Sequence, residues 1–141
     1  MIITTSIGLN HMDQNDEAIQ ITNTLDRDRL SELYGEDADY AATMFETFLD
    51  DVLPEFNEFN ELMQEQRWEE GRQLAHKLRP TLGMVGLSDL ETALAQLERL
   101  IITKVEPKQV RNYWRLFYNS LLSKKTLIQT EWERLLTTNK L

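Results

Sequence analysis

The sequence contains no cysteine, so disulfides, thiolate metal sites and cysteine nucleophiles are excluded. Five glycines and three prolines leave little room for the frequent turns of an all-β fold. No apolar run approaches the roughly 20 residues of a membrane-spanning helix. Residues 1–9 also lack the basic start and continuous apolar stretch of a signal peptide. We therefore expect a cytoplasmic protein without a membrane partner, a location that the absence of cysteine also suits.

Positive charge is scarce as well. The chain has 24 acidic against 15 basic residues, a net charge of −9 at pH 7. Binding to a phosphate backbone requires the opposite balance, so nucleic acid is not expected as a partner. With two histidines and no cysteine, a zinc site is not expected either, and we predict no metal or cofactor of the protein's own. The 141 residues suffice for one domain with a substantial core.

The first part of the chain divides into a leader and a short helix. Residues 1–23 are polar and weakly patterned, which predicts a flexible leader, and His11 within it is interpreted as incidental. The ordered domain is expected over residues 24–138. Asp26 can cap a short helix that ends near Gly35, with Leu25 and Leu30 in contact across the cap.

Four longer helices are predicted from apolar residues at helical spacing. The first spans about 37–64, with a kink or local break at Pro54. The second runs from Trp68 to Gly86. The third begins at a capping box formed by Ser88 and Glu91, and the last runs from 107 to 135. Because short connections make neighbouring helices antiparallel, we expect an all-α fold, an up-down four-helix bundle with a short extra N-terminal helix.

His76 is the main candidate for chemistry. It lies next to Ala75 on the buried row of the second long helix, so its own side chain falls near the edge of that row. Its neighbours are basic, polar or small: Arg72, Gln73, Lys77, Arg79, Pro80 and Gly83. Two arginines on this face, with Lys77 adjacent to His76, suit the binding of a phosphoryl group. The alternatives are an inert, hydrogen-bonded histidine and an ordinary solvated helix surface.

Pro80 and Gly83 are expected to affect the backbone at His76 and the approach of a partner protein. Pro80 has no N–H to donate to the carbonyl of His76, and its ring crowds that carbonyl. A bend or loosened turn at His76 is therefore expected. Gly83, one turn further along, is predicted to leave room for another protein to approach.

The run from Ala75 to Arg79, followed by Gly83 and Gly86-Leu87, resembles the signature of histidine phosphotransfer (HPt) domains. The resemblance covers roughly residues 25–136. It implies a helical bundle without an ATP site, a carrier of phosphoryl groups and not an enzyme. Such a domain accepts a phosphoryl group from a receiver-domain aspartate or a hybrid sensor histidine kinase, and passes it to a response regulator receiver aspartate. Mg²⁺ is then expected on the partner receiver domain.

The resemblance also implies roles for single residues. His76 would be phosphorylated on Nε2. Arg79 stands where the family usually has Lys near the phosphate, and Glu98 matches the acid or amide that hydrogen-bonds Nδ1. Without the resemblance, Glu98 would be an ordinary surface acid. The family commonly has Gly where this chain has Pro80, which alters the geometry of docking.

Two other functions stay open from the sequence. An HPt-like module could bind a receiver domain without accepting phosphate. An unrelated helical adaptor could carry a structural histidine, which would then be buried and doubly hydrogen-bonded. In each case, unbroken polar helix faces favour a monomer.

Overall fold

The computed structural model describes residues 22–138, and every regular element in this range is a helix. In chain order the elements are α1 (Arg27–Tyr34), α2 (Ala38–Thr47), the π-helical turn η2 (Phe48–Val52), α3 (Leu53–Gln64), α4 (Trp68–Met84), α5 (Ser88–Ile102), α6 (Pro107–Ser123) and α7 (Lys125–Leu136). The predicted all-α class is confirmed for this part of the chain. The predicted leader lies outside the described residues up to position 21, and His11 with it.

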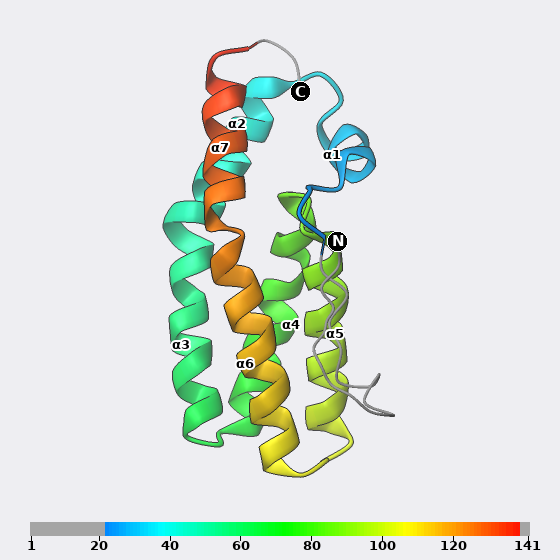
Figure 1. The fold of residues 1–141 in the computed structure, drawn as a ribbon, viewed down its shortest axis with the longest axis vertical. Helices are drawn as coiled ribbons and strands as arrows, with labels where there is room; N and C mark the ends of the chain where they lie inside the picture. The colour runs from blue at the N-terminus through cyan, green and yellow to red at the C-terminus, as the bar shows by residue number, and fades with distance from the viewer. Residues whose placement is uncertain (1–21, 139–141) are drawn as a thin grey trace.

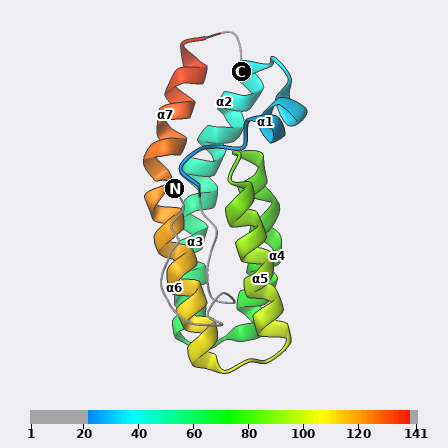
Figure 2. The same ribbon diagram turned by 45° about the vertical axis from the view of Figure 1, so that its right-hand side comes forward.

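Four helices, α3, α4, α5 and α6, lie side by side along the long axis of the molecule (Figures 1 and 2). The chain reverses direction at the short connections between them, so sequential neighbours are antiparallel. α2 extends beyond α3, and α7 extends beyond α6, at the same end of the molecule. α1 packs against this end of α4 and against α2. Within the described residues, no helix is both long and apolar enough to cross a bilayer.

The core fixes which face of α4 points outward. The predicted row on α4 is buried throughout, at Gly71, Ala75, Leu78, Leu82 and Val85. Opposite it, large aromatic side chains fill the space between α3 and α6. The rings of Phe59 and Trp114 stack with centroids 4.4 Å apart, and the Trp114 indole donates a 2.7 Å hydrogen bond to Asn60. With Ala75 fully buried, the adjacent His76 side chain is directed away from the core.

The predicted short helix is confirmed as α1. The Asp26 carboxylate accepts a 3.0 Å hydrogen bond from the Arg29 backbone N–H, as an N-cap does. Gly35 ends the helix with φ +58°, a left-handed conformation that glycine adopts at low cost. Leu25 and Leu30 are both buried. The beginning of α1 is therefore fixed onto the rest of the molecule.

The predicted break in the first long helix is also confirmed. The segment between α2 and α3 is a π-helical turn, in which the Leu53 N–H donates to the Phe48 carbonyl five residues earlier. Pro54 follows directly, in the first turn of α3. The missing N–H of proline falls where the hydrogen-bond register changes from the π-helical turn to α3, and the chain accommodates Pro54 at that point.

The prediction of a single last helix is wrong, because α6 and α7 are separated at Lys124. The Lys124 backbone has φ −90° and ψ −7°, and its N–H bonds to the Leu121 carbonyl three residues earlier. Its side chain is buried, and its ammonium donates to the Thr22 carbonyl. The apolar spacing from Leu121 to Ile128 is the same with or without this break, so periodicity could not detect it.

The capping box at Ser88 is wrong as well, although α5 does begin there. Leu87 is the N-cap residue, and no side chain caps the helix. The Ser88 hydroxyl instead donates a 2.7 Å hydrogen bond to the Asp26 carboxylate. Asp26 also accepts the Arg29 N–H, so one carboxylate joins the start of α1 to the start of α5. A contact across 62 positions replaces the local cap.

Candidate functional site

His76 lies on the outward face of α4, and 67% of its side chain is exposed. Its Nδ1 lies 3.3 Å from Oε1 of Glu98 on the neighbouring helix α5. Nε2 has no hydrogen-bond partner within the described part of the chain. This geometry differs from the buried, doubly hydrogen-bonded histidine expected of a purely structural role.

Glu98, in contrast to the exposed His76, is buried, and only 8% of its side chain is exposed. Its second oxygen, Oε2, lies 2.9 Å from Nη1 of Arg79. That contact is an ion pair whose angles fall outside hydrogen-bond geometry. A buried carboxylate therefore lies between the imidazole and the guanidinium, and the structure brings together the three residues that the resemblance singled out.

The carboxylate determines which nitrogen of His76 is available. Ionised carboxylates only accept hydrogen bonds, so Nδ1 carries the proton in the contact with Glu98. In a neutral imidazole Nε2 then holds the free lone pair. That lone pair points away from the core on an exposed ring. The arrangement can present a nitrogen nucleophile to a second molecule while the opposite side of the ring is held in place.

The basic neighbours of His76 are paired with acids. Arg72 donates two hydrogen bonds to Glu69, the shorter of 2.5 Å, and Gln73 donates to the same carboxylate. Lys77 reaches across to α3 and bonds to Glu55 at 2.9 Å. The hydrogen bonds that Arg72 donates to Glu69 raise the pKa of Arg72, and the one that Lys77 donates to Glu55 raises the pKa of Lys77. The predicted positive face is thus largely neutralised in this state.

The expectation for Gly83 is wrong. Gly83 is buried, and a Cβ at this position would lie 2.5 Å from the Glu91 carboxylate and 3.0 Å from the Arg29 guanidinium. Its small size admits these two side chains of the same protein and does not open a space for a partner. Pro80, by contrast, is exposed one turn from His76. α4 continues past it to Met84, so the proline does not end the helix.

The two acids that pair with the basic neighbours of His76 were not identified from the sequence. Glu69 stands three residues before Arg72, a spacing that places both on one helix face and could have revealed the pair. Glu55 is 22 positions from Lys77 and on another helix, so no local sequence pattern could predict this pair. Residues 22–138 contain no cluster of three or more metal-binding side chains.

The comparison with protein families gives one match, to the family described as Hpt domain, over residues 43–137. This range is more than half of the chain, and it contains His76, Arg79 and Glu98 but not α1. Comparison with curated proteins and with solved structures yields no match.

Proposed function

Since the chain belongs to the Hpt domain family, whose members carry out histidine phosphotransfer in two-component signalling, we propose that His76 is its phosphorylated residue. The donor is a receiver-domain aspartate or a hybrid sensor histidine kinase, and the acceptor is the receiver aspartate of a response regulator. The observation that carries the proposal is the exposed imidazole whose Nδ1 faces a buried carboxylate, which leaves Nε2 free.

The transfer step needs little from this chain beyond the nucleophile. The Nε2 lone pair attacks phosphorus of the aspartyl phosphate, the bond from phosphorus to the aspartyl oxygen breaks, and the aspartate leaves as a carboxylate. The phosphorylated ring keeps its Nδ1 proton and gains positive charge. Glu98 stabilises that charge from 3.3 Å, and the reverse step returns the phosphoryl group to a second receiver. Mg²⁺ and most of the electrostatic stabilisation belong to the receiver domain.

Arg79 is the side chain best placed to bind the phosphoryl group once it is on His76. It is one turn from His76, and its guanidinium is part-exposed while it contacts Glu98. A forked guanidinium can bind phosphoryl oxygens with two donors. Arg72, Gln73 and Lys77 are proposed as a supporting rim that acts on a partner, and Pro80 as a compact contact surface.

The remaining parts of the proposal concern scaffold and context. We place the domain over residues 24–138, as an up-down four-helix bundle with α1 as a short additional helix. The family consists of phosphocarrier modules and not of ATP-using enzymes. The protein is proposed to work as a cytoplasmic monomer without a cofactor of its own.

The test is phosphoryl transfer from a phosphorylated receiver domain. The wild-type protein should acquire label that is labile in acid and stable in base, as a phosphohistidine is. His76→Ala should abolish the label without unfolding the helices, since the side chain lies outside the core. His11→Ala is the matched control, because His11 is the other of the two histidines. Equal labelling of wild type and His76→Ala would refute the assignment, and receiver binding without transfer would favour a purely interacting module.

A further inference from the structure

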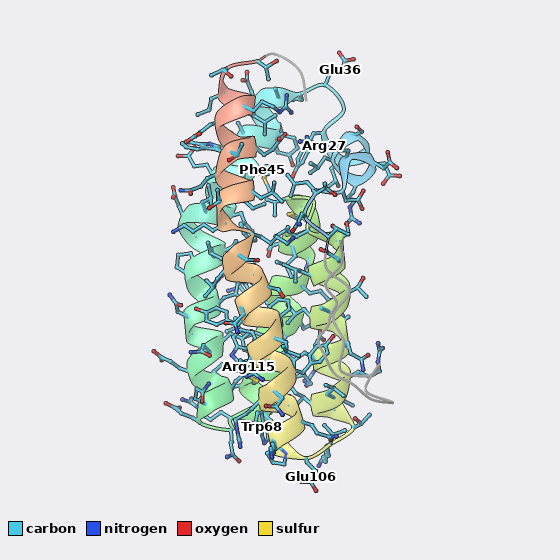
Figure 3. All side chains as sticks on the ribbon, viewed as in Figure 1. Arg27, Glu36, Phe45, Trp68, Glu106 and Arg115 are labelled. Atoms are coloured by element: carbon cyan, nitrogen blue, oxygen red, sulfur yellow. The ribbon has the colours of Figure 1, made fainter. Side chains whose placement is uncertain are left out.

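A cleft of about 420 Å³ opens at the end of the molecule where α4 begins and α5 connects to α6. Trp68 and Glu106 mark this end in Figure 3, opposite to Arg27. The walls are mainly apolar, from Trp68, Ile101, Val105 and Val110. Glu69 and Lys104 add the charged groups of the lining. The volume lies in the usual range of small-molecule sites, roughly 300–1,000 Å³.

The geometry of the α5–α6 connection builds this cleft. Lys104 has φ +59°, and the N–H groups of Lys104 and Val105 bond back to Ile101 and Leu100. These two bonds form a Schellman motif, in which the left-handed position is usually glycine. With lysine there instead, the turn carries a cationic side chain in the lining of the cleft.

The two charged groups of the lining differ in whether they have an oppositely charged partner. The Glu69 carboxylate is engaged by Arg72 and Gln73. Lys104 forms no ion pair with any acid in residues 22–138. A cleft with apolar walls and one uncompensated cation is complementary to a ligand that has an apolar body and a single negative charge.

We propose that this cleft binds a small amphipathic monocarboxylate. The apolar body packs between Trp68 and the aliphatic side chains of Ile101 and Val110, and the carboxylate pairs with Lys104. The site is distinct from the phosphoryl site, because Glu69 and His76 are seven residues apart on α4, about 10 Å along the helix. A single cleft of this size is too small for a stable protein interface, which favours a small molecule over a second protein.

The experiment is a titration of the full ¹⁵N-labelled chain with 3-phenylpropionate, followed by amide and indole chemical shifts. We expect saturable shifts at Trp68, Ile101 and Val110, with a Kd of roughly 0.1–1 mM for a ligand of this size. The neutral 3-phenylpropionamide should bind about tenfold more weakly, since it lacks the charge-assisted contact. Binding of the amide and the acid with equal affinity would overturn the role assigned to Lys104.

Variants complete the test. Lys104→Gln should weaken binding of 3-phenylpropionate about tenfold, and Val105→Glu, which adds a negative charge to the wall, should abolish it. Lys108→Gln is the matched control, because it removes an exposed lysine that does not line the cleft. Circular dichroism checks that each variant is folded. Equal binding by wild type and Lys104→Gln, shifts away from the cleft, or shifts that depend only on protein concentration would each overturn the proposal.

Discussion

Oε1 of the buried Glu98 lies 3.3 Å from Nδ1 of the exposed His76, so one side of the imidazole is held inside the protein while the other faces solvent. The two residues are on different helices, α5 and α4, which are in extensive contact along their length. The orientation of the ring is therefore set by how these helices pack. Because Glu98 holds Nδ1 while Nε2 faces solvent, Glu98 acts as a positioning residue in the proposed transfer.

The first prediction concerns this pair. Glu98→Ala should slow labelling of His76 by a phosphorylated receiver roughly tenfold, the effect of losing one hydrogen bond of about 1.4 kcal/mol. Glu98→Gln should recover part of the rate, because its amide oxygen can still accept from Nδ1. The measurement is the initial rate of label transfer. If both variants label at the wild-type rate, Glu98 does not position the ring.

The second prediction separates Arg79 from its neighbour Arg72. Arg79→Gln should lower the free energy of unfolding by about 1–3 kcal/mol, because a buried carboxylate loses its cation. Arg72→Gln should change it by less than about 0.5 kcal/mol, since its partner Glu69 is exposed. Urea unfolding midpoints measure both variants. Equal stability losses would mean that the Arg79–Glu98 contact contributes no more to the free energy of unfolding than the exposed Arg72–Glu69 pair.

The third prediction uses two glycines that both have a positive φ. Gly86 and Gly35 have φ +79° and +58°, so alanine is strained at either position. At Gly86 the new Cβ would also lie 3.1 Å from Leu25 Cβ and 3.2 Å from the Asp26 nitrogen, whereas at Gly35 nothing lies within 4 Å. Gly86→Ala should therefore be the more destabilising by about 1 kcal/mol or more in urea unfolding. Equal losses would show that the segment before α1 is free to move away.

Particular residues show how far the sequence alone could reach. Ala75, Leu78 and Leu82 follow helical spacing, so the buried face of α4 and the outward position of His76 were predictable. Local signals also predicted α1 and the irregular turn before Pro54. Each of these features depends on residues within a few positions of one another along the chain.

The features that were missed depend on distant contacts. The Ser88 hydroxyl donates to Asp26 and does not cap its own helix. The Lys124 ammonium donates to the Thr22 carbonyl, 102 positions away. Within the site, Glu98 was identified only through the family resemblance, because its contact with His76 requires knowing how two helices pack. The acid that pairs with Lys77 lies on a third helix. Side-chain contacts between helices, and not the helices themselves, were beyond the sequence.

The fourth prediction concerns acid stability through Glu131. Burial acts to raise the pKa of Glu131, but hydrogen bonds from Arg27 and Arg134 outweigh it, and the pKa lies below its ordinary value of 4.5. Arg27 of α1 makes two of these bonds, at 2.8 and 2.7 Å. A lowered carboxyl pKa stabilises the fold above the ordinary pKa, and this stabilisation is lost as the pH falls through the folded-state value.

The free energy of unfolding, measured in urea between pH 7 and pH 3, should therefore fall below about pH 4.5 more steeply in the wild type than in Glu131→Gln. At pH 7 the variant should be less stable by about 1–3 kcal/mol. Glu133→Gln, at an exposed position on the same helix, serves as the control and should keep the wild-type slope. Parallel pH curves for wild type and Glu131→Gln would contradict the prediction.

The last prediction concerns Pro80, which interrupts the hydrogen-bond ladder of α4 without ending the helix. Pro80→Ala restores an N–H that can donate to the carbonyl of His76, and should raise the free energy of unfolding by up to about 3 kcal/mol. Pro80→Gly, which carries the residue common in the family, should gain about 1 kcal/mol less because of the low helix propensity of glycine. Hydrogen exchange at position 80 should show a protected amide in the alanine variant. Since Pro80 is exposed, and the partners of Glu98 are His76 and Arg79, both variants should still accept label on His76. A variant that is more stable and still binds the receiver, but is no longer labelled, would mean that the missing hydrogen bond is itself required for transfer, and that the geometry of Nε2 depends on the backbone of the same turn.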